Sequence, residues 1–178
     1  DFPTEGIDDL IIESTRGDSP REANYTREAE RQKFGQIIAE TLENGGAVLI
    51  PVFAFGKTQE VALMLKELME EEIIPQSPVH IGGLSSKMTA ISDEYCDRKQ
   101  RHTRHRGFKI LQEYSDLRVM PKGRAEPEYS PGHIYAISSG MMSENTVSNR
   151  FAKHVITNPR DALLFVGYAD PETPAGKI

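Results

Sequence analysis

The sequence predicts an α/β fold with a mainly parallel sheet and helices on both faces of that sheet. Short, continuously apolar segments such as "AVLIPV" at residues 47–52 are typical of strands that are covered on both faces. Most of these segments precede a segment whose apolar residues have helical spacing. Strands and helices that alternate in this way are joined by right-handed crossovers in a parallel sheet.

The first predicted elements precede the glycine pair Gly45-Gly46. Residues 7–13, "IDDLIIE", form a short apolar run that ends at polar residues, which predicts a strand leading into a turn. Residues 26–43 predict a helix, because their apolar side chains recur every three or four positions and the two glycines supply a stop signal.

The segment 47–52 predicts the next strand, and a tight turn and a second helix follow it. The same pattern returns at residues 79–83, "VHIGG", before a helix expected at about 87–99. The buried stripe of the second helix is expected at Val61, Met64, Leu65, Leu68 and Met69.

The C-terminal half repeats this pattern once more. Residues 133–139, "HIYAISS", predict a strand, and residues 144–158 predict the helix that follows it. Residues 162–168, "ALLFVGY", predict a last strand. Residues 112–131 contain three prolines and are predicted to be mostly loop.

Length and composition predict one domain with its own core, since the chain has 178 residues of which 38% are hydrophobic. The chain begins at Asp1 rather than Met, and we expect it to be a piece of a longer protein. No apolar run approaches the roughly 18 residues that span a bilayer, so no membrane contact is expected. The only cysteine, Cys96, cannot form an internal disulfide, which favours a cytoplasmic location.

The charge is unevenly distributed along the chain. The net charge is −6, yet residues 98–109, "RKQRHTRHRGFK", contain six Lys or Arg and no acidic residue. Such a run is typical of a solvated face or of a patch that contacts RNA. His102 and His105 have helical spacing, but no carboxylate or thiolate beside them completes a ligand set, so no metal site is predicted there.

The turn at residues 51–59, "PVFAFGKTQ", ends like a phosphate-binding loop in Gly56-Lys57-Thr58. Such a loop requires its first glycine where this chain has Pro51, and proline offers no N–H and fixes φ, which disfavours a nucleotide-binding P-loop. Thr58 is instead expected to cap the following helix, and Lys57 to favour an anion such as a phosphate. The alternative is a plain helix cap with a solvated lysine.

Two further segments carry candidate site residues. In "SSGMM", Ser138 and Ser139 offer hydroxyl groups and Gly140 permits close approach of the backbone, while the two methionines are either adaptable apolar surfaces for flat bases or buried packing residues. Glu13 ends the first predicted strand, where a carboxylate anchors hydrogen bonds or orients a catalytic group. Parallel sheets gather such turns at the carboxyl ends of their strands, where ligands bind.

Five segments together resemble the β-CASP segment of the RNA-processing metallo-β-lactamases. In order, they are "DDLIIESTRGD", "VLIPVFAFGKTQEVALML", "VHIGGLSSKMTAI", "YAISSGMMSENTVSNRF" and "LLFVGYADPETPAGKI". That family includes the endonuclease subunit of the eukaryotic cleavage and polyadenylation factor and ribonuclease J. Arg16 and Lys57 depart from the family pattern, in which tyrosine and arginine are common at these positions.

The resemblance implies that residues 1–178 form one β-CASP domain, with residues 1–18 at the junction to a metallo-β-lactamase lobe that holds two zinc ions. No zinc is expected in this chain itself. The implied activity is hydrolysis of RNA phosphodiester bonds in mRNA 3′-end processing or in RNA maturation and decay, with this segment clamping the substrate and inactive alone. The implied roles are catalytic support by Glu13 and RNA binding by Phe53, Phe55, Lys57, Thr58, Ser138, Ser139 and Gly140.

Two other functions remain open at this point. A non-catalytic scaffold is the first, because the family also contains members whose zinc ligands have decayed and which act through partner binding. A small nucleotide-binding α/β domain is the second, because the turn chemistry at Lys57 suits any phosphate. The expected partners are RNA and the missing lobe, and a homodimer is left open. The sequence does not distinguish endonuclease from 5′-to-3′ exonuclease action.

Overall fold

The computed structural model describes residues 6–12, 14, 17–22, 24–97, 107–121 and 126–178 of the chain. Its helices are α1 (Arg27–Glu43), α2 (Lys57–Glu70), α3 (Leu84–Glu94), α4 (Ile110–Glu113) and α5 (Val147–Ile156), with a short 3₁₀ helix, η1 (Pro174–Lys177). Its strands are β1 (Val48–Pro51), β2 (Val79–Ile81), β3 (Leu117–Val119), β4 (Ile134–Ile137) and β5 (Ala162–Leu163).

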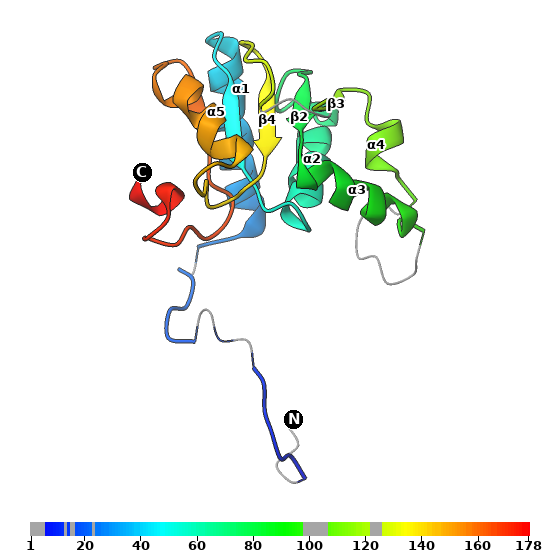
Figure 1. The fold of residues 1–178 in the computed structure, drawn as a ribbon, viewed down its shortest axis with the longest axis vertical. Coiled ribbons are helices and arrows are strands. Elements are labelled where there is room, and N and C mark those ends of the chain that lie inside the picture. The colour runs from blue at the N-terminus through cyan, green and yellow to red at the C-terminus, as the bar shows by residue number, and fades with distance from the viewer. Residues whose placement is uncertain (1–5, 13, 15–16, 23, 98–106, 122–125) are drawn as a thin grey trace.

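The strands form one sheet in the order β3-β2-β4-β1-β5, and all of its strand pairs are parallel. In the central pair, Val48 of β1 lies opposite Ile134 of β4. Because all strands run in the same direction, their carboxyl ends and the turns that follow them meet at one edge of the sheet. Figure 1 shows the connection from β2 to α3 and the chain beyond β4 at this edge.

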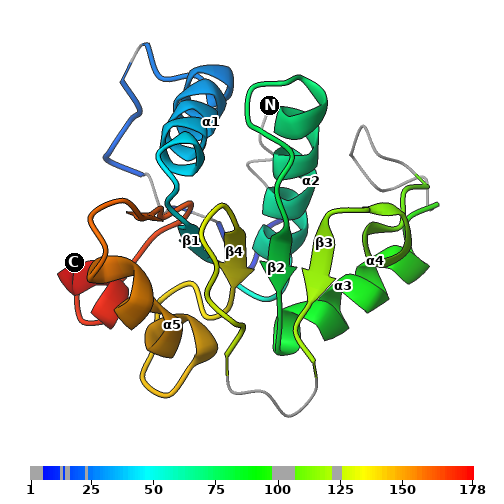
Figure 2. The same ribbon diagram turned by 90° about the horizontal axis from the view of Figure 1, so that it is seen from above.

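Alternation of side chains along β1 and β4 divides the core into two layers. Val48 and Ile50 belong to the layer that packs against α1 and α2. Leu49 and Tyr135 belong to the other layer, which packs against Phe151 and its neighbours on α5. Figure 2 shows α1 and α2 on one side of the sheet and α5 on the other. The predicted α/β fold with helices on both faces of a parallel sheet is confirmed.

Helices α1 and α2 confirm two predicted helices. Thr26 caps α1, because its Oγ1 accepts a hydrogen bond from the backbone N–H of Ala29 at 3.1 Å. The chain leaves α1 through Gly45, whose φ of +70° suits a residue without a Cβ. On α2, Val61 and Leu65 are fully buried against the sheet, as their spacing predicts.

The strand predicted at residues 7–13 is wrong for the described residues 7–12, which contain no strand. Ile11 is 98% exposed and Ile12 is 67% exposed. A strand requires partners for its backbone N–H and C=O groups, and no described residue pairs with this segment. In Figure 1 the segment runs away from the sheet towards the N-terminus.

The described residues of segment 112–131 are mostly loop, as predicted, but they include the end of α4 and the strand β3, whose Leu117 pairs with Val79 of β2. Three residues are too short for a periodic signal, so the sequence pattern does not reveal this strand. Other boundaries differ by a few residues: α3 begins and ends earlier than predicted, α5 is shorter at both ends, and β5 contains only two residues of the predicted strand. Within the described ranges, no helix combines the length and apolarity needed to cross a bilayer.

Candidate functional site

The turns after β1, β2 and β4 meet at the carboxyl edge of the sheet and line one groove of about 770 Å³. Phe53 and Phe55 come from the first turn, Leu84 from the second, and Ser138 and Ser139 from the third. The structure therefore brings four of the predicted site residues together. Phe55 is 70% exposed and Phe53 is 43% exposed, so the groove presents aromatic rings that a flat apolar group can cover.

A narrow crevice continues this groove past Phe53 and is lined also by Lys57, Gly140 and Phe165. Gly140 packs directly against Phe53: a Cβ built on Gly140 would lie 3.1 Å from the Phe53 ring and 3.1 Å from its backbone nitrogen. The close approach that the sequence predicts at Gly140 therefore exists, but it is an approach to Phe53 within the fold.

The turn after β1 is held by its own polar groups. Gly56, at φ +77°, occupies the N-cap of α2, so the prediction that Thr58 caps this helix is wrong. The side chain of Gln59 accepts a hydrogen bond from the N–H of Gly56 at 2.7 Å and donates one to the carbonyl of Ala54 at 3.2 Å. Thr58 is fully buried, and its hydroxyl donates to the carbonyl oxygen of Phe53 at 2.8 Å. Thr58 therefore holds the turn that carries Phe53 in place from the interior of the protein.

A buried polar bridge joins this turn to α3. The hydroxyl oxygen of Thr58 lies 3.0 Å from that of Ser85, and the amide nitrogen of Gln59 donates to the hydroxyl oxygen of Thr89 at 2.8 Å. Farther along α3, both carboxylate oxygens of Asp93 accept backbone N–H bonds from the start of α4, at 3.0 and 2.8 Å. These residues are not identified from the sequence pattern, although Ser85, Thr89 and Asp93 recur at helical spacing.

The outer face of α3 carries exposed apolar side chains beside the exposed charged residues Lys87 and Glu94, whereas its inner face is polar. Leu84 is 55% exposed, Ile91 46% and Tyr95, just after the helix, 44%. Ser85 and Thr89, on the inner face, are fully buried. The polarity of the buried face of this helix is therefore reversed from the usual pattern, in which the buried face is apolar.

The segment after β4 is folded against the start of α5. The hydroxyl oxygen of Ser139 accepts a hydrogen bond from the N–H of Ser143 at 3.1 Å, and the hydroxyl of Ser148 donates to the Ser139 carbonyl at 2.7 Å. Met142 is buried against α5 in the core. Of the two interpretations of the methionines, that of a buried packing residue is the one that applies to Met142. The Met141 sulfur accepts a hydrogen bond from the N–H of Asp170 at 3.3 Å.

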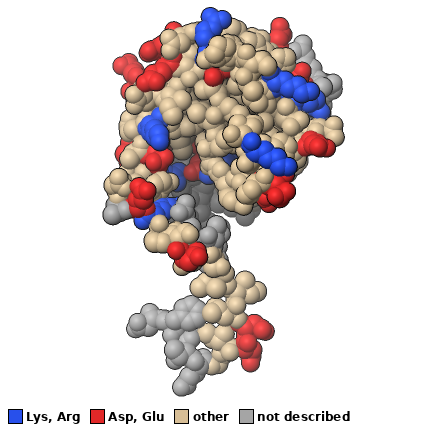
Figure 3. All heavy atoms as spheres, turned by 90° about the vertical axis from the view of Figure 1, so that its left-hand side faces the viewer, with Lys and Arg blue, Asp and Glu red and all other residues tan. Residues whose placement is uncertain are grey.

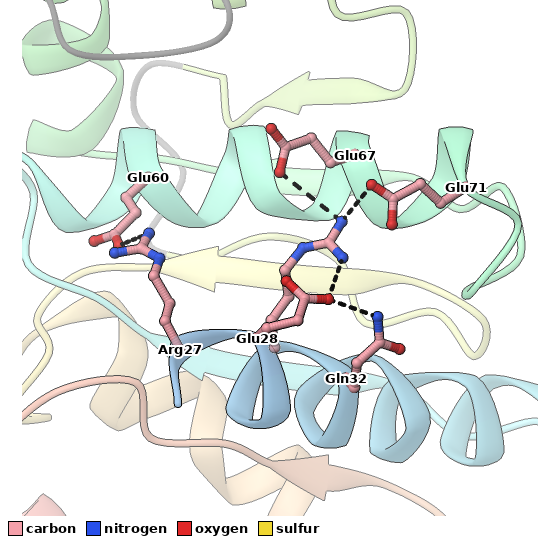
Figure 4. A network of polar contacts seen from close by, with 7 residues as sticks. Arg27, Glu28, Gln32, Glu60, Glu67 and Glu71 are labelled. Atoms are coloured by element: carbon pink, nitrogen blue, oxygen red, sulfur yellow. Dashed lines mark hydrogen bonds and ion pairs between the residues drawn. The ribbon is translucent and has the colours of Figure 1, made fainter. Parts of the chain in front are cut away.

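Two cations converge on one carboxylate beside the groove. Lys57 places Nζ 2.7 Å from Oε2 of Glu60, and Arg27 places a guanidinium nitrogen 2.7 Å from Oε1. Figure 4 shows Arg27 reaching from α1 to Glu60 on α2. Burial acts to raise the pKa of Glu60, but the contacts with Lys57 and Arg27 outweigh it and lower the pKa. Glu60 is therefore ionised at neutral pH.

In the part of the chain that the structure describes, no three His, Cys, Asp or Glu residues are grouped to hold a metal ion. His80 and His133 form a pair, with Nε2 of the first 3.0 Å from Nδ1 of the second. Burial, followed by the charges of His133 and Arg118, lowers the pKa of His80 to about 4. Glu13 lies outside the described residues, as do His102, His105 and the rest of segment 98–106.

The family model of the Beta-Casp domain matches residues 58–178. The chain belongs to the Beta-Casp domain family. Similar proteins include the transcription termination factor FttA of Methanocaldococcus jannaschii, 29% identical over 178 residues, and the endoribonuclease ysh1 of Schizosaccharomyces pombe, 32% identical over 184 residues. The RNase J-like protein of Methanocaldococcus jannaschii is 29% identical over 174 residues.

The matches to FttA, ysh1 and the RNase J-like protein cover 97%, 100% and 94% of this Beta-Casp chain. They cover only 28%, 23% and 39% of the three relatives. The chain therefore spans well under half the length of the curated relatives that it matches, and the family identifies a domain rather than a whole protein.

Proposed function

We propose that this Beta-Casp domain grips RNA for a zinc-dependent ribonuclease whose metal-binding lobe lies outside residues 1–178. The observation that carries the proposal is the groove at the carboxyl edge of the sheet, where turns from three strands bring Phe53, Phe55, Ser138 and Ser139 together. Parallel sheets bind ligands at this edge. Relatives named as an endoribonuclease and as an RNase J-like protein support RNA as the ligand.

The groove suits a single strand of RNA better than a duplex. Its aromatic rings are available to stack on unpaired bases, and each such stack contributes roughly 1 to 3 kcal/mol. The hydroxyl of Ser139 accepts a bond from Ser143 and keeps its own proton for a phosphate or ribose oxygen. Lys57 supplies a cation at the adjoining crevice.

We expect the domain to contact the phosphate backbone of the RNA at a few positions rather than over a broad surface. Lys and Arg side chains are interspersed with Asp and Glu on the face that Figure 3 shows, so this face offers no broad basic surface. Lys57 is the cation that we propose to meet an RNA phosphate beside the groove. Thr58 and Gly140 complete the site by holding the Phe53 turn in place.

Hydrolysis itself belongs to the part of the protein outside this chain. Zinc ions bound there would activate water for attack on the phosphodiester. Glu13 is proposed to orient an imidazole that protonates the leaving oxygen, as the family resemblance implies. A cytoplasmic location and RNA maturation or decay as the process accord with this activity.

The test compares the full-length protein with residues 1–178 on a single-stranded RNA. The full-length protein is expected to cleave the RNA and to lose cleavage, but not RNA binding, when EDTA removes the metal. Residues 1–178 are expected not to cleave. Cleavage by the EDTA-treated segment would contradict the division between a gripping domain and a catalytic lobe.

The same assay separates the two alternatives. A full-length protein that binds RNA but does not cleave it with zinc present would be a scaffold. Displacement of RNA by micromolar ATP would identify a nucleotide-binding domain.

A further inference from the structure

A second pocket lies between α1 and α2 and shares Lys57 and Phe165 with the narrow crevice. Its volume is about 430 Å³, and it is lined by Arg21, Arg27, Lys57 and Glu60 among other residues. Lys57 also lines the narrow crevice, which in turn reaches Phe53 in the groove. The crevice therefore shares lining residues with both the groove and the pocket, so the three lie in succession near the carboxyl edge of the sheet.

The pocket already holds an anion, the carboxylate of Glu60. Lys57 and Arg27 each approach one of its two oxygens at 2.7 Å. Lysine has three N–H donors and arginine has five, so both cations have donors beyond these bonds. The side chain of Arg27 is 78% exposed and that of Lys57 is 33% exposed, so an incoming phosphate can reach both.

A third cation, Arg21, also lines the pocket, and its guanidinium carbon lies 4.9 Å from the centre of the Tyr25 ring. Arg31, deeper in the pocket, is paired with Glu71 of α2 at 2.8 Å. Figure 4 shows this second set of contacts beyond Glu60 on the facing sides of α1 and α2. Besides Arg31, the cations that line the pocket are Lys57, Arg27 and Arg21, and its carboxylates are those of Glu30 and Glu60.

We propose that this pocket is a second phosphate site for the RNA strand and that Glu60 competes with the phosphate for Lys57 and Arg27. The inference rests on the proposed function, since it takes RNA as the ligand of the groove. A phosphodiester and a carboxylate accept the same charge-assisted bonds from Lys and Arg. In the absence of RNA, the carboxylate of Glu60 holds the side chains of Lys57 and Arg27 in position. When RNA binds, the same carboxylate offsets part of the positive charge that attracts the phosphate.

The experiment compares Glu60→Gln with Glu70→Gln in the full-length protein. Both substitutions remove one negative charge from α2, but Glu70 pairs with Lys66, and neither of these residues lines the pocket. Affinity for a single-stranded RNA is measured at several salt concentrations. Glu60→Gln is expected to tighten binding about threefold to tenfold more than Glu70→Gln, with a steeper salt dependence equivalent to about one additional phosphate contact.

A third variant, Arg27→Gln, tests the same site at a side chain that is 78% exposed. It is expected to weaken RNA binding and to make the salt dependence shallower by about one phosphate contact. An unchanged affinity for Arg27→Gln, or equal effects of Glu60→Gln and Glu70→Gln, would overturn the second phosphate site and leave RNA binding by the groove intact. Failure of the unmodified protein to bind RNA would overturn both proposals.

Discussion

The hydroxyl oxygens of Thr58 and Ser85 lie 3.0 Å apart in the interior and join the turn after β1 to the first turn of α3. Both side chains are fully buried. Two of the three turns that line the groove are therefore fixed to each other by a contact that no solvent reaches. The geometry of the groove depends on this contact as well as on the residues that face the ligand.

Replacing Thr58 by valine tests that contact. Thr58→Val keeps the shape of the side chain but removes its hydrogen bonds to the Ser85 hydroxyl and to the Phe53 carbonyl, and it is expected to lower the free energy of unfolding by about 1 to 2 kcal/mol. Thr58→Ser keeps the hydroxyl and is the matched control. Urea unfolding followed by circular dichroism measures both, and a valine variant as stable as the unmodified protein would contradict the role of the bridge.

Gly140→Ala tests the packing of the third turn on Phe53. The added Cβ would lie 3.1 Å from the ring, so the ring has to move, and overpacking of this kind costs about 1 kcal/mol or more. We expect lower stability together with weaker RNA binding. Gly167→Ala is the control, because Gly167 lines the same crevice and its Cβ would meet nothing within 4 Å. Equal effects of the two substitutions would contradict this account.

Phe55→Ala is expected to weaken binding of single-stranded RNA about tenfold and to leave stability nearly unchanged. The ring is 70% exposed, so its removal costs little packing but removes a stacking surface. Because the chain contains no tryptophan, Phe55→Trp adds a fluorescent reporter at this position. Quenching of the added fluorescence by RNA is expected, and its absence at saturating RNA would show that no base stacks on residue 55.

The histidine pair predicts how stability depends on pH. The pKa of His80 is lowered from 6.5 to about 4, so between these values the unfolded chain binds a proton that the folded chain does not. The free energy of unfolding therefore decreases as the pH falls from 6.5 towards 4, by up to about 1.4 kcal/mol per pH unit for a single group.

His80→Phe keeps a ring against Tyr135, whose centroid lies 4.7 Å from that of His80, and removes the titrating group. Urea unfolding at pH 7.5, 5.5 and 4.5 is expected to show a shallower loss of stability for this variant than for the unmodified protein. Identical pH profiles would assign the loss to other groups.

The sequence predicts the parts of this fold that depend on local patterns. Helix α1 begins one residue after the predicted start, because Thr26 provides a cap and the apolar stripe continues to Leu42. The meeting of Phe53, Phe55, Ser138 and Ser139 also follows from sequence, because parallel strands place their carboxyl ends at one edge.

What the sequence does not predict depends on contacts between distant residues. The bond between Thr58 and Ser85 spans 27 positions, and the ion pair between Arg27 and Glu60 spans 33. Neither follows from a local pattern. Gly56 rather than Thr58 occupies the N-cap of α2, because Thr58 is drawn into the interior by the Phe53 carbonyl. Segment 7–12 is the converse case. Its apolar pattern is typical of a strand, but no described residue pairs with it, and it forms no strand.

The reversed polarity of α3 has a consequence for the route by which the chain folds. If burial of apolar side chains alone set the orientation of α3, Leu84 and Ile91 would face the interior, and the helix would be turned by about half a rotation about its own axis from the native orientation. The native orientation is selected by hydrogen bonds that exist only once the turn after β1 has closed and Thr58 and Gln59 are in place. We therefore expect α3 to dock late, after the β1–α2 unit has formed, and to be the first helix released when that unit is weakened.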